Sequence, residues 1–222
     1  MTEYARIAEF IASLEPEEDP VLVQIEREAG KERIPIIRKE TGALLKTLVA
    51  AVRPRKILEV GTAVGYSALL MAQVMGRDCR ITTIENYDKR ILAARENFRR
   101  AGREREITLI EGDAGEVMGT LLPGTYDFIF MDAAKGQYIH WLPAVLSLLA
   151  PGGMLVSDNV LQDGDVLESR FAVERRDRTI HHRMREYLYA LKHTEGVQTA
   201  LLPVGDGVAV SVKQICGGGL GV

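Results

Sequence analysis

Three oxygen-bearing side chains, Asp132, Asp158 and Asn159, stand at the ends of two apolar segments of the chain. Asp132 follows "YDFIFM" (126–131), and the other two follow "MLVS" (154–157). If both runs are neighbouring parallel strands, their carboxyl ends meet at one edge of a sheet, and the three side chains converge. Two carboxylates and an amide oxygen suit a hard divalent cation such as Mg²⁺, Mn²⁺ or Ca²⁺. The alternative is that these residues cap separate helices and never meet.

Lys135 lies three residues after Asp132, on the segment that leads into the next helical pattern. A divalent cation nearby disfavours the ammonium form of a lysine, so Lys135 could accept the proton of a hydroxyl bound at the same place. This arrangement predicts general-base catalysis. The alternative interpretation is an ordinary surface lysine.

A glycine-containing segment, "EVGTAVGYS" (59–67), follows another strand pattern. Gly61 and Gly65 permit a sharp turn close to a ligand, and the next helix offers its N-terminus to an anionic group. Ala63 occupies the second glycine position of the dinucleotide-binding pattern G-x-G-x-x-G. The segment therefore indicates a cofactor loop or, alternatively, only a tight turn between strand and helix.

Two further acids end later strand patterns. Glu85 could accept hydrogen bonds from both ribose hydroxyls of an adenosine-containing cofactor, either S-adenosylmethionine (SAM) or a nicotinamide dinucleotide. Asp113 and the amide of Ala114 could bind adenine, and Asp113 could also cap the helix that follows it.

A parallel sheet must position these residues, and the chain predicts one. Helical patterns fill the first 55 residues, and strand and helix patterns alternate after them. The strand patterns lie at 56–60, 80–85, 106–112, 126–132 and 154–158. Crossover helices between them imply an α/β, Rossmann-like, doubly wound and mostly parallel sheet. The runs 197–204 and 207–213 predict a C-terminal antiparallel hairpin at its edge, which makes seven strands.

Composition bounds the class of protein. A chain of 222 residues predicts one domain: a helical segment (1–55), a core (56–215) and a disordered tail (216–222). A net charge of -3 argues against a protein that coats nucleic acid through its overall field. Two cysteines without metal or redox spacing, no signal-peptide pattern and no long apolar run predict a cytoplasmic protein.

Three motifs resemble the cation-dependent O-methyltransferases, the class that includes catechol and caffeoyl-coenzyme A methyltransferases. They are "ILEVGTAVGYSALLMA" (57–72), "MDAAKGQY" (131–138) and "SDNVL" (157–161). The resemblance implies a SAM-dependent enzyme with a divalent cation, Mg²⁺ being expected. By position it assigns SAM contacts to Glu59, Gly61, Tyr66, Ser67, Glu85, Asp113, Ala114 and Asp132, cation binding to Asp132, Asp158 and Asn159, and catalysis to Lys135 and Asp132.

A more specific resemblance is to the bacterial tRNA 5-hydroxyuridine methyltransferases. It rests on the same motifs, on "ERRDRTIHHRMREY" (174–187), which overlaps an arginine-rich segment at 170–185, and on "PVGDGVAVS" (203–211). It implies methylation of 5-hydroxyuridine at the tRNA wobble position, where the 5-hydroxyl and 4-carbonyl chelate a cation as a catechol does. Ala133 and Ala134 stand where catechol enzymes carry bulky rings, which leaves space for a larger substrate. The candidate RNA contacts are Arg175, Arg176, Arg178, His182 and Arg183.

Other interpretations stay open. The same chemistry could act on a small catechol-like or phenolic metabolite. A nicotinamide-dependent oxidoreductase is disfavoured by the broken glycine pattern, and a non-catalytic RNA-binding module would need no cation. The arginine-rich segment could be a solvated helix face or a subunit interface. The amphipathic helix expected at 2–14 could pair two subunits, and the resemblance implies a homodimer.

Overall fold

The computed structural model describes residues 3–169 and 171–215. The predicted tail at 216–222 and Arg170 of the arginine-rich segment lie outside the described residues. Three helices precede the sheet: α1 (Glu3–Ser13), α2 (Pro20–Glu32) and α3 (Lys39–Val52). Asp19 caps α2 by accepting a hydrogen bond from the Val21 amide at 2.7 Å, and Pro20 opens that helix, where no amide donor is needed.

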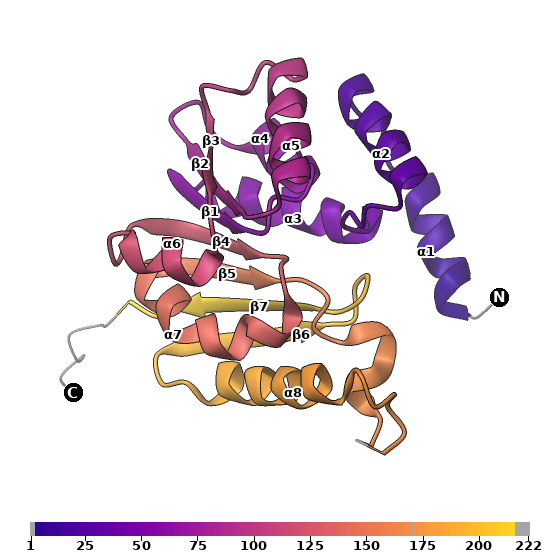
Figure 1. Cartoon of the computed structure of the whole chain (residues 1–222), viewed down its shortest axis with the longest axis vertical. Helices are drawn as coiled ribbons and strands as arrows, with labels where there is room; N and C mark the ends of the chain where they lie inside the picture. The colour runs from indigo at the N-terminus through magenta and orange to yellow at the C-terminus, as the bar shows by residue number, and fades with distance from the viewer. Residues whose placement is uncertain (1–2, 170, 216–222) are drawn as a thin grey trace.

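The sheet has seven strands in the order β3-β2-β1-β4-β5-β7-β6, as Figure 1 shows. They are β1 (Lys56–Val60), β2 (Arg80–Glu85), β3 (Ile107–Glu111), β4 (Tyr126–Met131), β5 (Leu149–Ser157), β6 (Val197–Leu202) and β7 (Val208–Lys213). β1 to β5 run parallel, and β7 runs antiparallel to both β5 and β6. The predicted Rossmann-like fold with a C-terminal hairpin is confirmed.

One strand differs from expectation, because β5 begins at Leu149 rather than at 154. The segment 149–153 pairs with the start of β4 through Tyr126, across an irregularity in the register. Its Pro151-Gly152-Gly153 sequence is typical of a turn, so the sequence did not predict that the strand begins this early.

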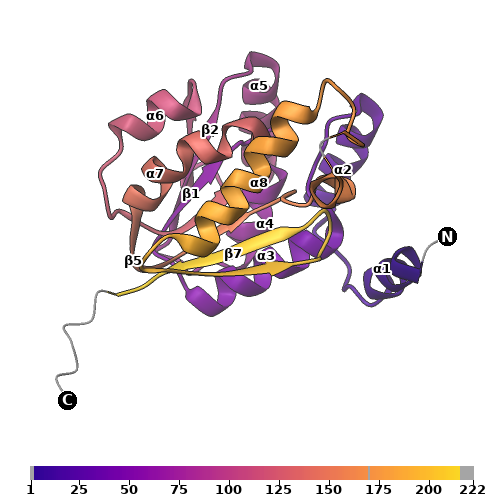
Figure 2. The same ribbon diagram turned by 90° about the horizontal axis from the view of Figure 1, so that it is seen from below.

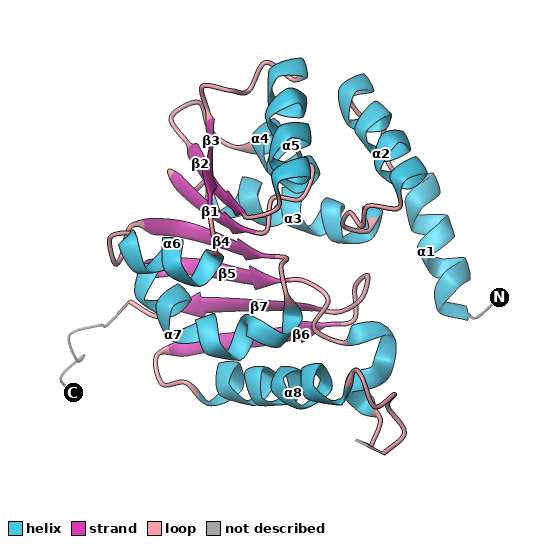
Figure 3. Cartoon of the chain, in the orientation of Figure 1, coloured by secondary structure: helices cyan, strands magenta, loops and turns pink. Residues whose placement is uncertain are grey.

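Helices cover both faces of the sheet. The crossover helices are α4 (Tyr66–Val74), α5 (Asp88–Arg100), α6 (Ala114–Thr120), α7 (Tyr138–Leu148) and α8 (Arg178–His193), with short 3₁₀ helices η1 (Lys135–Gln137) and η2 (Gln162–Leu167). α6, α7 and α8 pack on one face, and α3 and α4 lie on the other (Figures 2 and 3). Among the described residues, no helix is both long and apolar enough to cross a lipid bilayer.

Alternate residues of each strand face opposite cores. Ile57, Phe128 and Phe130 pack with α3 and α4, whereas Leu58 and Ile129 pack with α6, α7 and α8. Both faces of β4 are therefore buried, which is why its sequence is an unbroken apolar run rather than an alternating one. The run ends where the sheet ends, and the next residue is polar.

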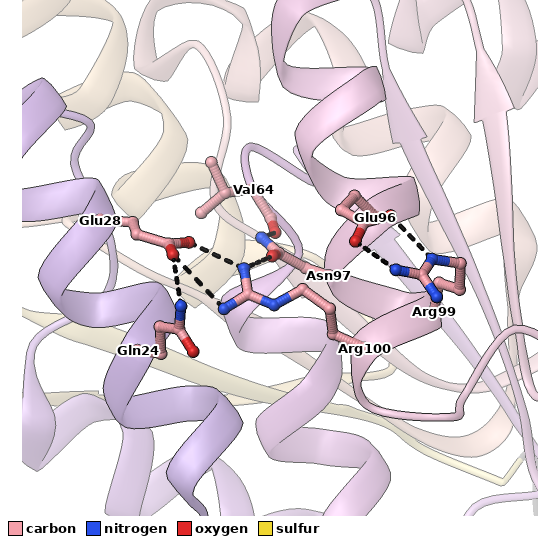
Figure 4. Close-up of polar contacts among 7 residues, drawn as sticks. All are labelled: Gln24, Glu28, Val64, Glu96, Asn97, Arg99 and Arg100. Carbon is pink, nitrogen blue, oxygen red and sulfur yellow. Dashed lines mark hydrogen bonds and ion pairs between the residues drawn. The ribbon is translucent and has the colours of Figure 1, made fainter.

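The N-terminal helices are tied to the sheet through α5 (Figure 4). Glu28 of α2 pairs with Arg100 of α5 at 2.8 Å and also accepts a hydrogen bond from Gln24 at 2.9 Å. One turn earlier in α5, buried Asn97 donates to the Val64 carbonyl at 2.9 Å. α5 thus fixes the glycine-containing turn between β1 and α4 while it holds α2.

Candidate active site

The tips of β4 and β5 bring two acids to one place. Met131 pairs with Ser157 in parallel register, so Asp132 and Asp158 follow at equivalent positions. The Asp158 amide donates to the Met131 carbonyl at 3.0 Å, which joins the two tips. Asn159 has a left-handed backbone, with φ of 55°, and its amide donates to Asp158 Oδ1 at 2.8 Å.

The negative charge of Asp158 is unfavourable in its buried position. Only 2% of the residue is exposed. Burial, and then the negative charge of Asp132, raises the pKa of Asp158 from its usual 3.8 to about 7, and Asp206 adds to the effect. Two neighbouring carboxylates in a poorly hydrated place repel one another unless a proton or a cation compensates them.

The donor set fits a hard divalent cation. Asp132, Asp158 and Asn159 offer carboxylate and amide oxygens, the ligands that Mg²⁺ and Ca²⁺ prefer. Within the described residues, no group of three or more His, Cys, Asp or Glu side chains is arranged to hold a metal ion, so a set containing an amide oxygen is the candidate. Burial is the largest cause of the raised pKa of Asp158, and a cation held beside it would favour its ionised form.

Lys135 forms an ion pair with Asp132 across 2.7 Å. Burial by itself lowers the pKa of Lys135, but the Tyr138 hydroxyl and the Asp132 carboxylate outweigh it, so the pKa lies above its usual value. Lys135 is thus charged as long as Asp132 compensates it. If Asp132 turns its charge toward a cation, the ammonium form loses that support.

A cavity of about 940 Å³ opens at this edge of the sheet, within the size range of small-molecule sites. Seven of the residues expected from the sequence line it: Gly61, Glu85, Asp113, Ala114, Asp132, Lys135 and Asn159. Tyr66 and Ser67 line a small adjoining cleft that shares Gly61 and Asp132 with the cavity. All of the sequence-predicted cofactor, cation and proton-transfer residues except Glu59 and Asp158 therefore line this cavity or the cleft beside it.

Glu59 and Asp158 stand behind the cavity wall, since both are buried and neither lines it. Glu59 accepts hydrogen bonds from Ser67 Oγ at 2.6 Å and from Thr83 Oγ1. Burial raises the pKa of Glu59 to about 8. Glu59 is 0% exposed and orients Ser67, and the cofactor contact expected of it stays a prediction.

Glu85 is held by three backbone amides. Its Oε2 accepts from Ala63 at 2.9 Å, and its Oε1 accepts from Asn86 and Tyr87 at 3.0 and 3.1 Å. These bonds fix the carboxylate at the tip of β2 against the turn that begins at Gly61. A carboxylate has lone pairs beyond these three bonds, so it can still accept ribose hydroxyls.

Two more positions explain the cofactor side of the cavity. Gly61 has φ of 101°, and a Cβ there would lie 2.2 Å from the Asp132 carbonyl oxygen, so only glycine lets β1 and β4 meet this closely. Asp113 caps α6 by accepting from the Gly115 amide at 2.8 Å. The capping alternative for Asp113 is thus present, together with a place on the cavity wall.

Most of the candidate RNA contacts have partners within the protein. Arg183 donates to the Gly136 carbonyl at 3.1 Å and Arg178 to the Val173 carbonyl at 3.2 Å. Arg176 pairs with Glu174 and Asp177, and His182 lies 3.4 Å from Glu186. Arg175 is exposed. Arg183 reaches the loop beside Lys135, whereas Arg176 and His182 are engaged with acids of their own segment.

Sequence reasoning did not single out Asp206 or Trp141, which also line the cavity. Asp206 lies in the turn between β6 and β7, within the motif "PVGDGVAVS", and no site role was expected of it. Because β6 runs parallel to the first five strands, its carboxyl end, and the turn after it, reach the same edge as theirs. Trp141 carries no such signal, since an indole in a helical pattern is typical of core packing.

Known proteins resemble this chain in both sequence and structure. Residues 12–214 match the family model for O-methyltransferase. A catechol O-methyltransferase of Niastella koreensis is 31% identical over 170 residues, which cover 74% of this chain and 77% of that protein.

Solved structures share the fold. A proposed caffeoyl-CoA O-methyltransferase from Staphylococcus aureus has a TM-score of 0.86 at 30% identity, covering 93% of this chain and 98% of that one. The O-methyltransferase TomG from Streptomyces achromogenes, solved in complex with SAM, has a TM-score of 0.83 at 26% identity, covering 96% of this chain and all of that one, 100%.

Proposed function

The chain belongs to the O-methyltransferase family, and we propose that it moves a methyl group from SAM to a hydroxyl that has a second oxygen beside it. One observation carries the proposal: Asp132, Lys135 and Asn159 share a single cavity with Gly61 and Glu85, the predicted cofactor positions. A methyl donor and a chelating acceptor would then meet at the tips of β1 and β4.

SAM would occupy the part of the cavity between Gly61, Glu85 and Asp113. TomG, which was solved with SAM, supports this assignment through its shared fold. The three hydrogen bonds from backbone amides orient Glu85 to receive the ribose. The methionine part would lie along the glycine turn, toward the small cleft lined by Ser67.

A divalent cation would be held by Asp132, Asp158 and Asn159. When bound, it would lower the pKa of the acceptor hydroxyl and orient both acceptor oxygens. Its positive charge would also compensate the two acids, of which Asp158 has a pKa raised to about 7 by burial and then by Asp132. We expect Mg²⁺ to fill this role.

Lys135 then acts as the general base. With Asp132 turned toward the cation, the Lys135 ammonium would lose a proton to solvent, and its neutral Nζ would then take the proton of the acceptor hydroxyl. The resulting oxyanion would attack the methyl carbon of SAM bound between Gly61, Glu85 and Asp113, and the electron pair of the broken carbon–sulfur bond would stay on sulfur in S-adenosylhomocysteine. The protein contributes mainly by orientation and by charge compensation.

For the acceptor we propose 5-hydroxyuridine at the wobble position of tRNA, with 5-methoxyuridine as product. Ala133 and Ala134 line the cavity and leave it wide beside Lys135. Arg183 and exposed Arg175 lie on the segment that follows the cation-binding turn, where a phosphate backbone would pass.

A small catechol-like acceptor is the second candidate. The relatives named catechol and caffeoyl-CoA O-methyltransferases favour it. Its two adjacent oxygens would make the same contacts with the cation, and it would need no basic surface. The oxidoreductase alternative lacks support, because family membership assigns the glycine turn to methyl transfer.

Methyl transfer from labelled SAM separates the acceptors. An anticodon stem-loop containing 5-hydroxyuridine, the same stem-loop with uridine, and catechol should each be tested with Mg²⁺ and with chelator. We expect labelling of the modified stem-loop alone, and only with Mg²⁺. Transfer to catechol but not to the stem-loop would overturn the tRNA proposal, and transfer that survives the chelator would overturn the cation proposal.

A further inference from the structure

Tyr138, the first residue of α7, has a fully buried hydroxyl with three partners. It donates to the Met131 carbonyl at 3.0 Å and accepts from the Ala133 amide at 3.1 Å. Lys135 Nζ also donates to it, at 3.4 Å. A phenol has one donor and two acceptor sites, so all are used. Met131 directly precedes the loop that starts at Asp132, and Ala133 and Lys135 belong to that loop.

The Met131 carbonyl is shared. Its oxygen accepts one hydrogen bond from the Tyr138 hydroxyl and one from the Asp158 amide, each at 3.0 Å. One oxygen atom thereby joins the tip of β4, the tip of β5 and the start of α7. Any movement of Tyr138 acts on the strand tips that carry both cation-binding acids.

A second buried tyrosine reaches the other tip. Tyr187 of α8 makes a hydrogen bond of 2.6 Å between its hydroxyl and Ser157 Oγ, and Ser157 directly precedes Asp158. The rings of Tyr138 and Tyr187 meet edge to face, with centroids 5.3 Å apart and planes at 70°. Both residues are 0% exposed, and neither lines the cavity.

Packing alone does not account for two tyrosines here. Phenylalanine would fill the same space without the cost of burying a hydroxyl, which is only recovered when the hydroxyl finds partners. In both cases the partners belong to the segments around the two acids. The hydroxyls therefore sit where they can define the geometry of those segments.

We propose that Tyr138 and Tyr187 are a pair of positioning residues that fix Lys135 and Asp132, on the β4 tip, relative to Asp158 on the β5 tip. The inference rests on the proposed function, since it assigns the pair a role in that reaction. Tyr138 acts on the loop that holds Lys135, and Tyr187 acts through Ser157 on Asp158. α7 and α8 thus take part in the chemistry without touching a substrate.

The Tyr138→Phe variant tests the first half. It keeps the ring and its contact with Tyr187 but removes all three hydrogen bonds. We expect kcat to fall by about 10- to 100-fold, the usual cost of losing a group that orients a ligand, while KM for SAM changes by less than about 2-fold. Mn²⁺ binding, measured by calorimetry without acceptor, should weaken by about 10-fold.

The Tyr187→Phe and Ser157→Ala variants test the second half. Each removes one partner of the same hydrogen bond, so each should weaken Mn²⁺ binding. The double variant should bind Mn²⁺ as tightly as the weaker-binding single variant, because both changes break the same hydrogen bond. Additive losses would mean that the two residues act separately, which would overturn the role of Tyr187.

Tyr126→Phe is the matched control. Tyr126 is also a buried tyrosine of the β4 region, but it begins that strand, at the far end from the site. We expect wild-type kcat and Mn²⁺ affinity from it. If Tyr138→Phe behaves like Tyr126→Phe in both measurements, the positioning role is wrong. If the wild-type protein methylates none of the acceptors, the proposed function fails, and Mn²⁺ binding still decides the positioning role.

Discussion

At the scale of single residues, the site contains charged groups whose protonation depends on their neighbours. Asp158 is buried beside Asp132, and Lys135 is held in its charged form by the same Asp132. Each of these states would change if the proposed cation were bound between the acids. The proton content of the site is therefore tied to its occupancy, which gives measurable consequences.

The stability of the cation-free protein should depend on Asp158. Burial and then Asp132 raise the folded-state pKa of Asp158 above its usual 3.8, to about 7. The protonated residue thus contributes stability that is complete below pH 3.8 and is lost as pH rises through about 7. We expect Asp158→Asn to unfold at a higher urea concentration than the wild type at pH 8 without divalent cation. Each pKa unit corresponds to about 1.4 kcal/mol.

The same comparison of the two proteins at pH 4 supplies the control, because residue 158 of the folded protein is then neutral in both. The advantage of Asp158→Asn should shrink there. Adding Mg²⁺ at pH 8 should stabilise the wild type more than the variant. A constant difference between the two proteins across the pH range would contradict the assignment.

Lys135 should be needed for proton transfer rather than for charge. Lys135→Met removes the base, and we expect kcat to fall by about 10²- to 10⁴-fold with SAM affinity preserved. Lys135→Arg keeps a cation beside Asp132, but a guanidinium does not give up its proton, so a similar loss is expected. Steady-state kinetics and SAM calorimetry measure both effects, and near-normal turnover by the arginine variant would refute the base.

At the scale of elements, the turn between β1 and α4 is the least tolerant part of the cofactor site. A methyl group on Gly61 would meet the Asp132 carbonyl oxygen at 2.2 Å, and φ is 101°. We expect Gly61→Ala to destabilise the protein by about 1–3 kcal/mol and to abolish SAM binding. Chemical unfolding and SAM titration measure the two effects.

Gly30→Ala provides the comparison for that change. Gly30 lies inside α2, and a Cβ there would meet nothing within 4 Å. Alanine is the better helix former, so this variant should gain about 0.5–1 kcal/mol and bind SAM normally. A similar loss of stability from both alanines would show that the Gly61 turn is not special.

The elements that sequence reasoning predicted best are the buried strands, because β4 carries a nearly continuous apolar run and β1 and β2 are short segments rich in Ile, Val, Leu and Thr. The site residues that end those strands followed from the fold. The hydrogen-bond partners of the arginines could not be predicted from the sequence. Arg183 donates to the Gly136 carbonyl, and Arg178 donates to the Val173 carbonyl. A backbone carbonyl is present at every residue, so sequence gives no sign of such a bond.

At the scale of the whole molecule, α1 stands at the margin (Figures 1 and 2). Four apolar residues at helical spacing on and just after it are exposed: Ile7, Phe10, Ile11 and Leu14. An apolar stripe of this kind is usually covered by another surface. We propose that two copies of the chain associate through it, in line with the homodimer implied by family resemblance.

Charged substitutions on that stripe should separate the copies. We expect Phe10→Asp with Leu14→Asp to sediment as a monomer while the wild type sediments as a dimer. Leu122→Asp is the control, since Leu122 is as exposed but lies after α6. A monomeric wild type, or a dimer that survives the double substitution, would rule out this interface.

Two of the helices before the sheet, α2 and α3, share its hydrophobic core. Leu45 and Val49 of α3 pack in the same cluster as Ile57 of β1. We propose that residues 3–55 and the core form one domain and unfold in one transition, as expected when no separate core exists. Coincident loss of helix signal and of aromatic-environment signal on heating would agree with this, and two transitions would not.

The place of β7 in the sheet bears on how the protein is made. Translation produces β6 before β7, yet β7 lies between β5 and β6. Until residues 208–213 emerge from the ribosome, the edge of β5 has no neighbour and Asp206 has no fixed position beside Asp158. Substrate capture by a nascent chain must therefore wait for this late insertion, and a chain cut short before it would present an open, aggregation-prone strand edge.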